Sequence, residues 1–229
     1  MWNVELHCHT YWSKDSLASP RALLEVCRQR GIDRLAVTDH NTLRGGLEAA
    51  ALAPERFIVG EEILTTEGEL LGYFLTEEVP AGLSPQETID RLRRQGAVIS
   101  VSHPYDYARQ GAWREEILRP LLPQLDALEA FNARTTSAGP NARAAALARQ
   151  AGLPGLAGSD AHAPFEVGRG LTVLEPFHDA ESFRRALASA RLVTRRSPAW
   201  VHLVSRYAVL RKRLGWKVPG GGRTVISDQ

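Results

Sequence analysis

The chain of 229 residues is long enough for one sizeable α/β domain with at most a small appendage. Its 44% hydrophobic and 24% charged residues are ordinary for a soluble globular protein, and no apolar run approaches the roughly 20 residues that cross a bilayer. Cys8 and Cys27 are too few for a disulfide framework. The first residues lack the basic segment and apolar core of a signal peptide, so we expect a cytoplasmic protein with reduced thiols.

The net charge of +2 hides an uneven distribution of charged residues. Residues 1–183 hold 17 basic and 25 acidic side chains, a net charge of −8, whereas residues 184–229 hold 11 basic and 1 acidic, a net charge of +10. An acidic body suits a site that gathers carboxylates around cations. A basic tail suits contact with a polyanion.

Segments typical of strands and of helices alternate along the chain. Strand-like apolar runs that end at polar residues cover residues 4–6, 34–38, 57–60, 70–75, 97–101 and 127–131. Capping signals predict a helix from Ser19 to Gly31, one from the capping box at Ser84 to about residue 95, and one from Asn141 to Gly152, followed by a short apolar turn. We count six or seven such units, fewer than the eight of a full barrel, so the pattern predicts a smaller or distorted α/β barrel with a parallel sheet.

His7 and His9 follow the first of these strands. Residues two apart on a strand point to the same side, so both imidazoles can hold one metal ion. The alternative is a pair of surface histidines. Cys8 should point the other way, which favours a packing role.

Five of the seven histidines come directly after a predicted strand or its equivalent turn, namely His7, His9, His40, His103 and His162. Asp39, Glu62 and Asp160 stand beside them, also at strand ends. A single zinc ion takes about four ligands, so this set indicates a cluster of two or three cations. Such a cluster activates water and neutralises a phosphate during displacement.

These motifs resemble, in their usual order, those of the PHP (polymerase and histidinol phosphatase) family. The matching segments, which lie within roughly residues 3–173, are His7-Cys8-His9, Thr38-Asp39-His40, Gly60-Glu61-Glu62, Ser102-His103-Pro104 and Gly158-Ser159-Asp160-Ala161-His162. The resemblance implies a distorted (β/α)7 barrel with a trinuclear metal centre at the C-terminal ends of the strands, which hydrolyses phosphoesters. It also implies a catalytic barrel over residues 1–175 and a PHP-associated segment packed on it over residues 176–215. The short run Gly220-Gly221-Gly222 predicts a flexible tail, which we place over residues 216–229.

The resemblance implies metal ligands residue by residue. The first metal takes His7, His9, Glu62 and Asp160, the second takes Glu62 as a bridge together with His103, and the third takes His40 and His162. Two further positions carry a carboxylate where the family can have histidine, and we expect Asp15 and Glu69 to be ligands or exposed loop carboxylates. Carboxylates prefer harder cations, so these two positions favour Mn²⁺ or Fe²⁺ over Zn²⁺. Glu61, next to the bridging glutamate, should face outward.

The remaining site predictions concern catalysis and the phosphate. With Glu62, we predict Asp39 and Arg134 to be catalytic: Asp39 holds a ligating imidazole or steers the attacking water, unless it only caps a helix. Arg134 is the first choice for a phosphate clamp, with Asn132 and the weaker candidate Arg169 beside it; the alternative is that these arginines are merely solvated.

No serine nucleophile elbow and no phosphate-binding loop is present in the sequence, so covalent catalysis is unsupported. We therefore expect direct attack on phosphorus by metal-activated water. The leading hypothesis is a phosphoesterase that acts on a nucleotide or an oligonucleotide end. The alternatives are a small-metabolite phosphatase of the histidinol-phosphate type and a non-catalytic PHP module that binds nucleic acid or a partner.

The basic C-terminal segment has three interpretations. Its arginines interleave with Trp200, Tyr207 and Trp216, a pattern that can track a nucleic-acid backbone and stack bases. Residues 204–214 can instead form an amphipathic helix on a membrane surface. The third interpretation is a helix docked on the barrel with a solvated basic face.

Overall fold

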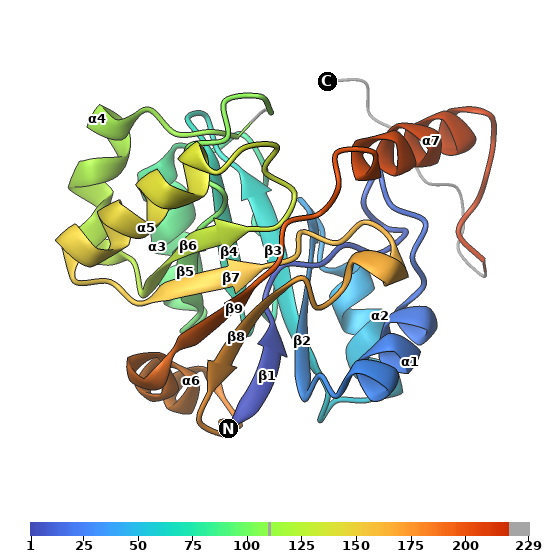
Figure 1. The fold of residues 1–229 in the computed structure, drawn as a ribbon, viewed down its shortest axis with the longest axis horizontal. Helices are drawn as coiled ribbons and strands as arrows, with labels where there is room; N and C mark the ends of the chain where they lie inside the picture. The colour runs from blue at the N-terminus through green and yellow to red at the C-terminus, as the bar shows by residue number, and fades with distance from the viewer. Residues whose placement is uncertain (110, 220–229) are drawn as a thin grey trace.

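One mixed sheet forms the frame of the molecule (Figure 1). The structure, a computed structural model, describes residues 1–109 and 111–219, and within these residues nine strands lie in the order β7-β6-β5-β4-β3-β2-β1-β8-β9. The strands are β1 (Trp2–Glu5), β2 (Arg34–His40), β3 (Phe57–Leu64), β4 (Glu69–Tyr73), β5 (Val98–Val101), β6 (Ala127–Asn132), β7 (Gly155–Gly158), β8 (Gly170–Leu174) and β9 (Arg191–Thr194).

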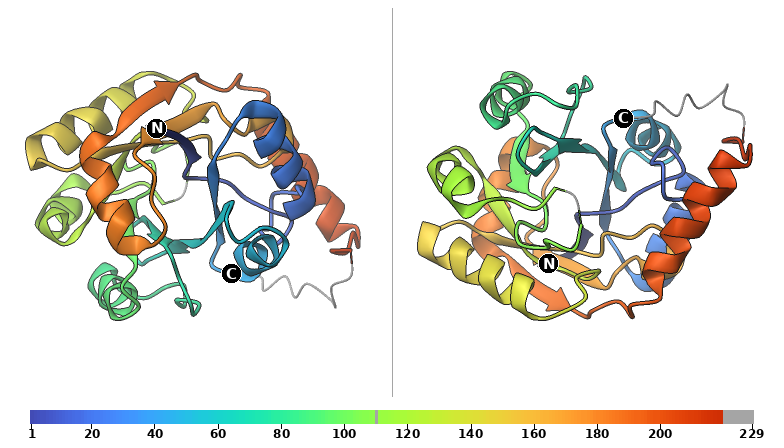
Figure 2. Two further views of the ribbon diagram at one scale, coloured as in Figure 1. Left: turned by 90° about the horizontal axis from the view of Figure 1, so that it is seen from below. Right: turned by 90° about the horizontal axis from the view of Figure 1, so that it is seen from above.

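The sheet curls into a nearly closed barrel, as Figure 2 shows along the strands. Strands β1, β2 and β3 are parallel, as are β5, β6 and β7, whereas β4 runs antiparallel to both of its neighbours and β8 runs antiparallel to β1. Ala157 N in β7, at one end of the strand order, donates to Thr172 Oγ1 in β8, near the other end, at 2.9 Å. The predicted distorted barrel is confirmed, and the two antiparallel strands are its main departure from a regular βα repeat.

Helices cover the outside of the ring (Figure 2). They are α1 (Pro20–Arg30), α2 (Arg44–Leu52), α3 (Pro85–Arg94), α4 (Glu115–Leu118), α5 (Gly139–Ala151), α6 (Ala180–Ala186) and α7 (Val201–Arg213), with short 3-10 helices η1 (Arg119–Gln124), η2 (Pro164–Glu166) and η3 (Leu187–Ser189). Helix α1 begins and ends as predicted, since Ser19 accepts from Ala22 N and Gly31 has a left-handed φ of 62°. The predicted capping box of α3 is also present.

Several boundaries differ from the sequence-based expectation. Asn141 does not cap α5, which begins at Gly139; its side chain instead accepts from Asn132 N at 3.0 Å. Glu62 lies inside β3 and not at its end, and the predicted turn before Gly158 is strand β7. Of the predicted flexible tail, residues 220–229 lie outside the described residues, while Val218 is buried.

An apolar cluster closes the barrel at the amino ends of the parallel strands. It takes side chains from each of β1 to β8 and from α6, including Val4, Ile58, Val98, Leu156 and Phe183. Apolar side chains fill this end of the barrel. The polar side chains that could form a site lie at the opposite end, where the parallel strands have their carboxyl ends. No helix among residues 1–109 and 111–219 is long and apolar enough to span a bilayer.

Candidate metal centre

Four polar side chains converge at the carboxyl end of the barrel. His7 and His9 follow β1, Glu62 comes from β3, and Asp160 follows β7. His9 Nε2 lies 3.2 Å from Asp160 Oδ1 and 3.4 Å from Glu62 Oε2, and His7 Nε2 lies 3.3 Å from Glu62 Oε2 and 3.6 Å from Asp160 Oδ1. All four side chains are buried. The structure thus brings together the residues predicted for a first metal.

These separations fit the edges of a coordination tetrahedron. Ligand atoms about 2.0–2.2 Å from one metal ion are about 3.3–3.6 Å apart in tetrahedral geometry, close to the four observed distances. Two of the same atoms, His7 Nε2 and Glu62 Oε2, are buried without a hydrogen-bond partner among the described residues. Buried polar atoms without a partner are rare in folded proteins, so both atoms fit a role as metal ligands.

A second group surrounds the other side of Glu62. Its Oε1 lies 3.2 Å from His103 Nε2, which is also 3.4 Å from Glu69 Oε2. Glu62 Oε2 lies 3.0 Å from His40 Nδ1, and Glu69 Oε1 is 4.0 Å from the same nitrogen. The buried Glu69 therefore faces the cluster and is not an exposed loop carboxylate.

A third group forms around Asp15. Its Oδ2 lies 3.1 Å from His162 Nε2, and its Oδ1 lies 3.7 Å from His40 Nε2 and is another buried atom without a hydrogen-bond partner in the described residues. The rings of His9 and His162 are 4.2 Å apart. His40 thus lies between the second and third groups, with one ring nitrogen toward each.

The neighbouring cationic groups hold the pKa values of Glu62, Asp15 and Asp160 well below their ordinary values, whereas burial and the charge of Glu62 raise the pKa of Glu69 to about 7. Burial raises the pKa of Glu62, but the neighbouring His7 and His40 outweigh burial and hold this pKa well below its ordinary value. Burial, together with His162 and His40, lowers the pKa of His9 to about 3. This lowered pKa favours the neutral imidazole at His9, the form that binds metals, whereas the neighbouring carboxylates raise the pKa values of His7 and His40.

A layer of outer partners orients the imidazoles. His7 Nδ1 lies 2.9 Å from Glu129 Oε1, and His9 Nδ1 lies 3.1 Å from Ser13 Oγ, which donates to Asp39 Oδ1 at 2.6 Å. These contacts leave Nε2 of both rings directed at the cluster. Asp39 also accepts a hydrogen bond from Thr10 N, and through Ser13 it helps to orient the ring of His9. It does not cap α2, because that helix has no side-chain cap.

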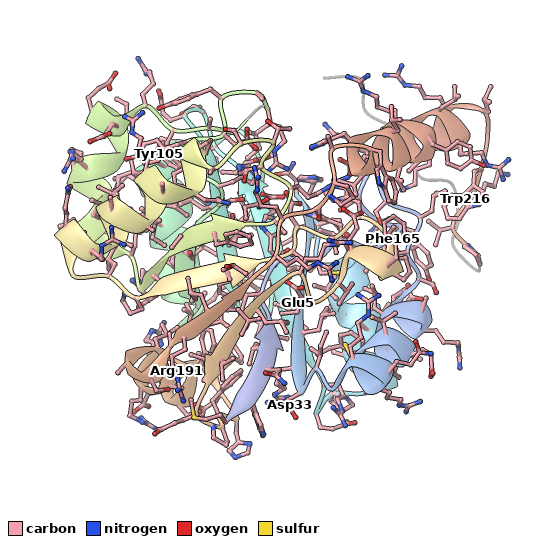
Figure 3. All side chains as sticks on the ribbon, in the orientation of Figure 1. Glu5, Asp33, Tyr105, Phe165, Arg191 and Trp216 are labelled. Carbon is pink, nitrogen blue, oxygen red and sulfur yellow. The ribbon has the colours of Figure 1, made fainter. Side chains whose placement is uncertain are left out.

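The sequence pattern predicts no role for Glu5, Ser13 or Glu129. Glu5, near the middle of Figure 3, is fully buried and accepts from Ser159, Gly168 N and His7 N. Burial raises the pKa of Glu5 to about 7. Glu5 lies between Val4 and Leu6, which both pack in the apolar cluster, so the alternation along β1 gave no signal for the burial of its carboxylate.

Two candidate ligands have left-handed backbone conformations. Asp160 has a φ of 52° and His103 a φ of 20°, values that non-glycine residues rarely adopt. The backbone N of His103 donates to Glu129 Oε2 at 2.7 Å, and Asn132 Nδ2 donates to Asp160 Oδ2 at 3.2 Å. Strain of this kind clusters at functional sites, where the surrounding contacts hold the residue in place.

Arg109 reaches the site from the loop after β5. Its guanidinium donates to Asp160 Oδ2, to Asp106 Oδ2 at 3.0 Å, and to Asn132 Oδ1 at 3.4 Å, and 22% of the side chain is exposed. The sequence offered no motif for this arginine, since it follows no strand directly. It places a cation beside the carboxylates at the mouth of the cluster.

The predicted phosphate clamp, Arg134, has other partners. Its guanidinium lies 3.1 Å from Glu166 and donates to Val201 O at 2.8 Å and to Ser205 Oγ at 2.9 Å, and the side chain is 2% exposed. Because these partners occupy it, Arg134 fastens α7 to the barrel. This geometry argues against the predicted phosphate contact.

Arg169, the second arginine predicted to contact phosphate, also lies outside the cluster. It lines a pocket of about 480 Å³ together with Arg195 and Arg196, and no candidate metal ligand contributes to that pocket. Asn132, by contrast, stands within the site, where it bonds both Asp160 and Glu129.

Comparison with known proteins identifies the family. The chain matches the PHP domain over residues 5–80 and the PHP-associated region over residues 138–192. The first match contains His7, His9, His40 and Glu62, and the second contains Asp160. The chain belongs to the PHP family, as the motifs predicted.

Two proteins of Methanocaldococcus jannaschii are similar in sequence, and both are named as uncharacterized. MJ0417 is 41% identical over 72% of this chain and 67% of its own length, and MJ1587 is 44% identical over 44% of this chain and 67% of its own length. A two-domain protein from Bacteroides vulgatus, described as containing a predicted PHP-like metal-dependent phosphoesterase, has a similar fold, with a TM-score of 0.70 and 18% identity. The similarity covers 84% of this chain but 64% of that one.

Proposed function

We propose that the protein is a metal-dependent phosphoesterase that hydrolyses a phosphate ester of a nucleotide or an oligonucleotide end. The observation that carries the proposal is the convergence of His7, His9, Glu62 and Asp160 at ligand-to-ligand distances of 3.2–3.6 Å. Membership of the PHP family and the fold shared with the Bacteroides vulgatus protein support it.

We assign two or three divalent cations to the three groups described above, with the predicted ligands in each. Such cations, when bound, activate water and neutralise charge on the phosphoryl group. Asp15 and Glu69 make the donor set rich in carboxylates, which favours Mn²⁺ or Fe²⁺ over Zn²⁺.

The protein's own groups bind and orient the substrate. We assign Arg109, in place of Arg134, to the phosphate oxygens, because its partly exposed guanidinium lies at the mouth of the cluster. Glu129 and Ser13 hold His7 and His9 in position. The water oxygen would form a bond to phosphorus as the P–O bond to the leaving alkoxide breaks, and the proton that the water loses would end on the alkoxide oxygen.

An apolar pocket next to His162 favours a nucleotide over an amino-alcohol phosphate. The pocket, of about 200 Å³, is lined mainly by small apolar side chains together with Tyr207, and none of its lining residues is acidic. It suits a flat, uncharged group such as a base. A cationic leaving group such as histidinol would find no carboxylate there.

The test is phosphate release by purified protein that has been stripped and reloaded with Mn²⁺. The substrates are nucleoside monophosphates, a 3′,5′-bisphosphate, a 5′-phosphorylated oligonucleotide and histidinol phosphate, with Asp160→Asn and Arg109→Ala beside the wild type. We expect turnover of a nucleotidic substrate, its loss in Asp160→Asn, and a higher KM with metal retained in Arg109→Ala. Preference for histidinol phosphate would select the metabolite phosphatase. Metal binding without turnover of any substrate would favour the binding module.

A further inference from the structure

Helix α7 is fixed to the barrel by one face. Val201 and Ala208 are buried on this face, and the ammonium of Lys212 donates to Tyr11 O at 2.7 Å and to Ser13 O. Arg134 binds the same face of the helix. The interpretation of the C-terminal segment as a docked helix therefore describes this side of α7 correctly.

The opposite face of α7 exposes large apolar side chains. They recur at spacings of three and four residues, which places them in one stripe along the helix. The stripe consists of Trp200, Leu203, Tyr207, Leu210 and Leu214, which are 53%, 62%, 54%, 53% and 76% exposed. Phe165 of η2, 39% exposed, extends it: its ring lies 5.3 Å from that of Trp200, beneath α7 in Figure 3. We call these six residues the apolar ridge.

The ridge concentrates exposed hydrocarbon in one place. Within the described residues, twelve large hydrophobic side chains are exposed, and six of them belong to the ridge. Exposed apolar side chains scattered singly are normal, but a contiguous patch marks an interaction surface. At 1.5 Å per residue, the helical part of the ridge is about 20 Å long.

Arginines flank the ridge on both sides. Arg206 and Arg213 lie on one side and Arg211 on the other, roughly 70–90° around the helix from the stripe at 3.6 residues per turn. All three side chains are exposed, and none lies within 4.0 Å of a carboxylate in the part of the chain that the structure describes. The surface thus combines an apolar centre with cationic edges.

We propose that the apolar ridge docks the protein on an anionic lipid bilayer. In that arrangement the ridge enters the interface and the flanking arginines reach the lipid phosphates, as in helices that lie in the membrane plane. Helix α7 lies at the outer edge of the molecule in both views of Figure 2, where a flat surface can approach it. This inference does not rest on the proposed phosphoesterase activity, although Tyr207 belongs both to the ridge and to the pocket next to His162.

The charges and shape argue against the other occupants. A second copy of α7 would bring its arginines against those of the first, with no carboxylate to offset them. Nucleic acid would use the arginines but leave the leucines exposed. A single acidic partner helix would contact one narrow stripe on α7 alone. The ridge is wider than such a stripe, because it also includes Phe165 from η2.

The experiment is flotation of the full-length protein with unilamellar vesicles of phosphatidylcholine containing phosphatidylglycerol, and with vesicles of phosphatidylcholine alone. We expect partition into the anionic vesicles that is at least about tenfold stronger than into neutral ones and falls with salt. The double variant Leu203→Ser/Leu210→Ser should lose at least about tenfold in partition. Arg206→Glu/Arg211→Glu should lose a similar factor on anionic vesicles only.

Matched controls separate the ridge from general surface effects. Leu47→Ser/Leu52→Ser changes exposed leucines on α2, and Arg28→Glu/Arg149→Glu reverses two arginines elsewhere on the surface; both should bind vesicles as the wild type does. Circular dichroism and thermal melting verify that each variant folds.

Three results would overturn the proposal. One is the absence of binding to anionic vesicles, or equal binding by the wild type and the Leu203→Ser/Leu210→Ser variant. Another is dimerisation, measured by light scattering, that this variant abolishes, which would assign the ridge to self-association. The third is binding of a single-stranded oligonucleotide by the wild type and this variant alike, without vesicle binding.

Discussion

Oε1 of Glu129 lies 2.9 Å from Nδ1 of His7, and Oε2 of the same carboxylate accepts from the backbone N of His103 at 2.7 Å. One glutamate therefore positions two candidate metal ligands that come from different strands. Gly158 leaves the room for this pair, because a Cβ at that position would collide with both Glu129 and His7.

Replacing Glu129 by glutamine should weaken the metal site without removing a ligand. An amide cannot offer the negative charge that steadies the imidazole of His7, and loss of such outer partners costs about 10–100-fold in metal affinity. Titration of stripped protein with Mn²⁺ measures the change. Glu175→Gln, a change at an exposed glutamate, is the control and should leave the affinity unaltered.

Replacing Ser13 by alanine should loosen His9. The hydroxyl of Ser13 contacts His9 Nδ1, Asp39 Oδ1 and the backbone N of His40, so its removal leaves buried groups without partners. We expect a loss of about 1–3 kcal/mol in the free energy of unfolding and a weaker metal site. Urea unfolding measures the first effect, with the exposed Ser137→Ala as control. Unchanged stability would contradict the assigned network.

Arg134→Met tests whether this arginine is structural. Removing one partner of a buried ion pair costs about 3–5 kcal/mol, because Glu166 is left charged or must be protonated. The double variant Arg134→Met/Glu166→Leu should recover part of this loss. Stability measured by urea unfolding that stays unchanged in Arg134→Met, together with a raised KM, would instead restore the phosphate clamp.

The buried Glu61 should make stability fall with rising pH. It points away from Glu62, as predicted, but it is fully buried; its Oε2 accepts from Val79 N at 3.0 Å, and burial raises its pKa from 4.5 to about 8. The protonated form is the one favoured by folding, so its contribution is complete below pH 4.5 and is lost as the pH rises toward 8. The slope is at most about 1.4 kcal/mol per pH unit.

Urea unfolding of stripped wild type and Glu61→Gln at several pH values between 5 and about 8 measures this contribution. The variant should gain stability relative to the wild type as the pH rises. Glu77→Gln, at an exposed glutamate, should follow the wild type. Parallel profiles for wild type and Glu61→Gln would show that Glu61 is ionised in the folded protein.

The cluster of candidate metal ligands could be anticipated because it depends on local pattern. His7, His40, His103 and Asp160 all lie at or just beyond the ends of parallel strands, and such ends meet at one edge of a barrel regardless of the details of packing. The caps of α1 and α3 were equally local signals. The antiparallel direction of β4 could also have been predicted, because the four residues between β3 and β4 are too few for the crossover that a parallel strand needs.

The outer partners could not be anticipated, because they depend on contacts between distant segments. Arg134 binds Val201, 67 positions further on, and this contact requires α7 to dock. Glu129 faces His7 only through the pairing of β6 with β7, whose register shifts at this residue. Arg109 lies on a loop without a pattern, and its approach to Asp160 follows from the folded path of that loop.

The most direct test of the metal centre compares wild type with His9→Ala after both are stripped and reloaded with Mn²⁺, with bound metal and phosphate release measured on the same samples. We predict two or three equivalents of bound metal and metal-dependent phosphate release for the wild type. His9→Ala should bind at least one equivalent less, and its release should fall by about 100-fold or more. Equal metal content and equal phosphate release in the two proteins would contradict the assignment of this cluster as the catalytic metal site.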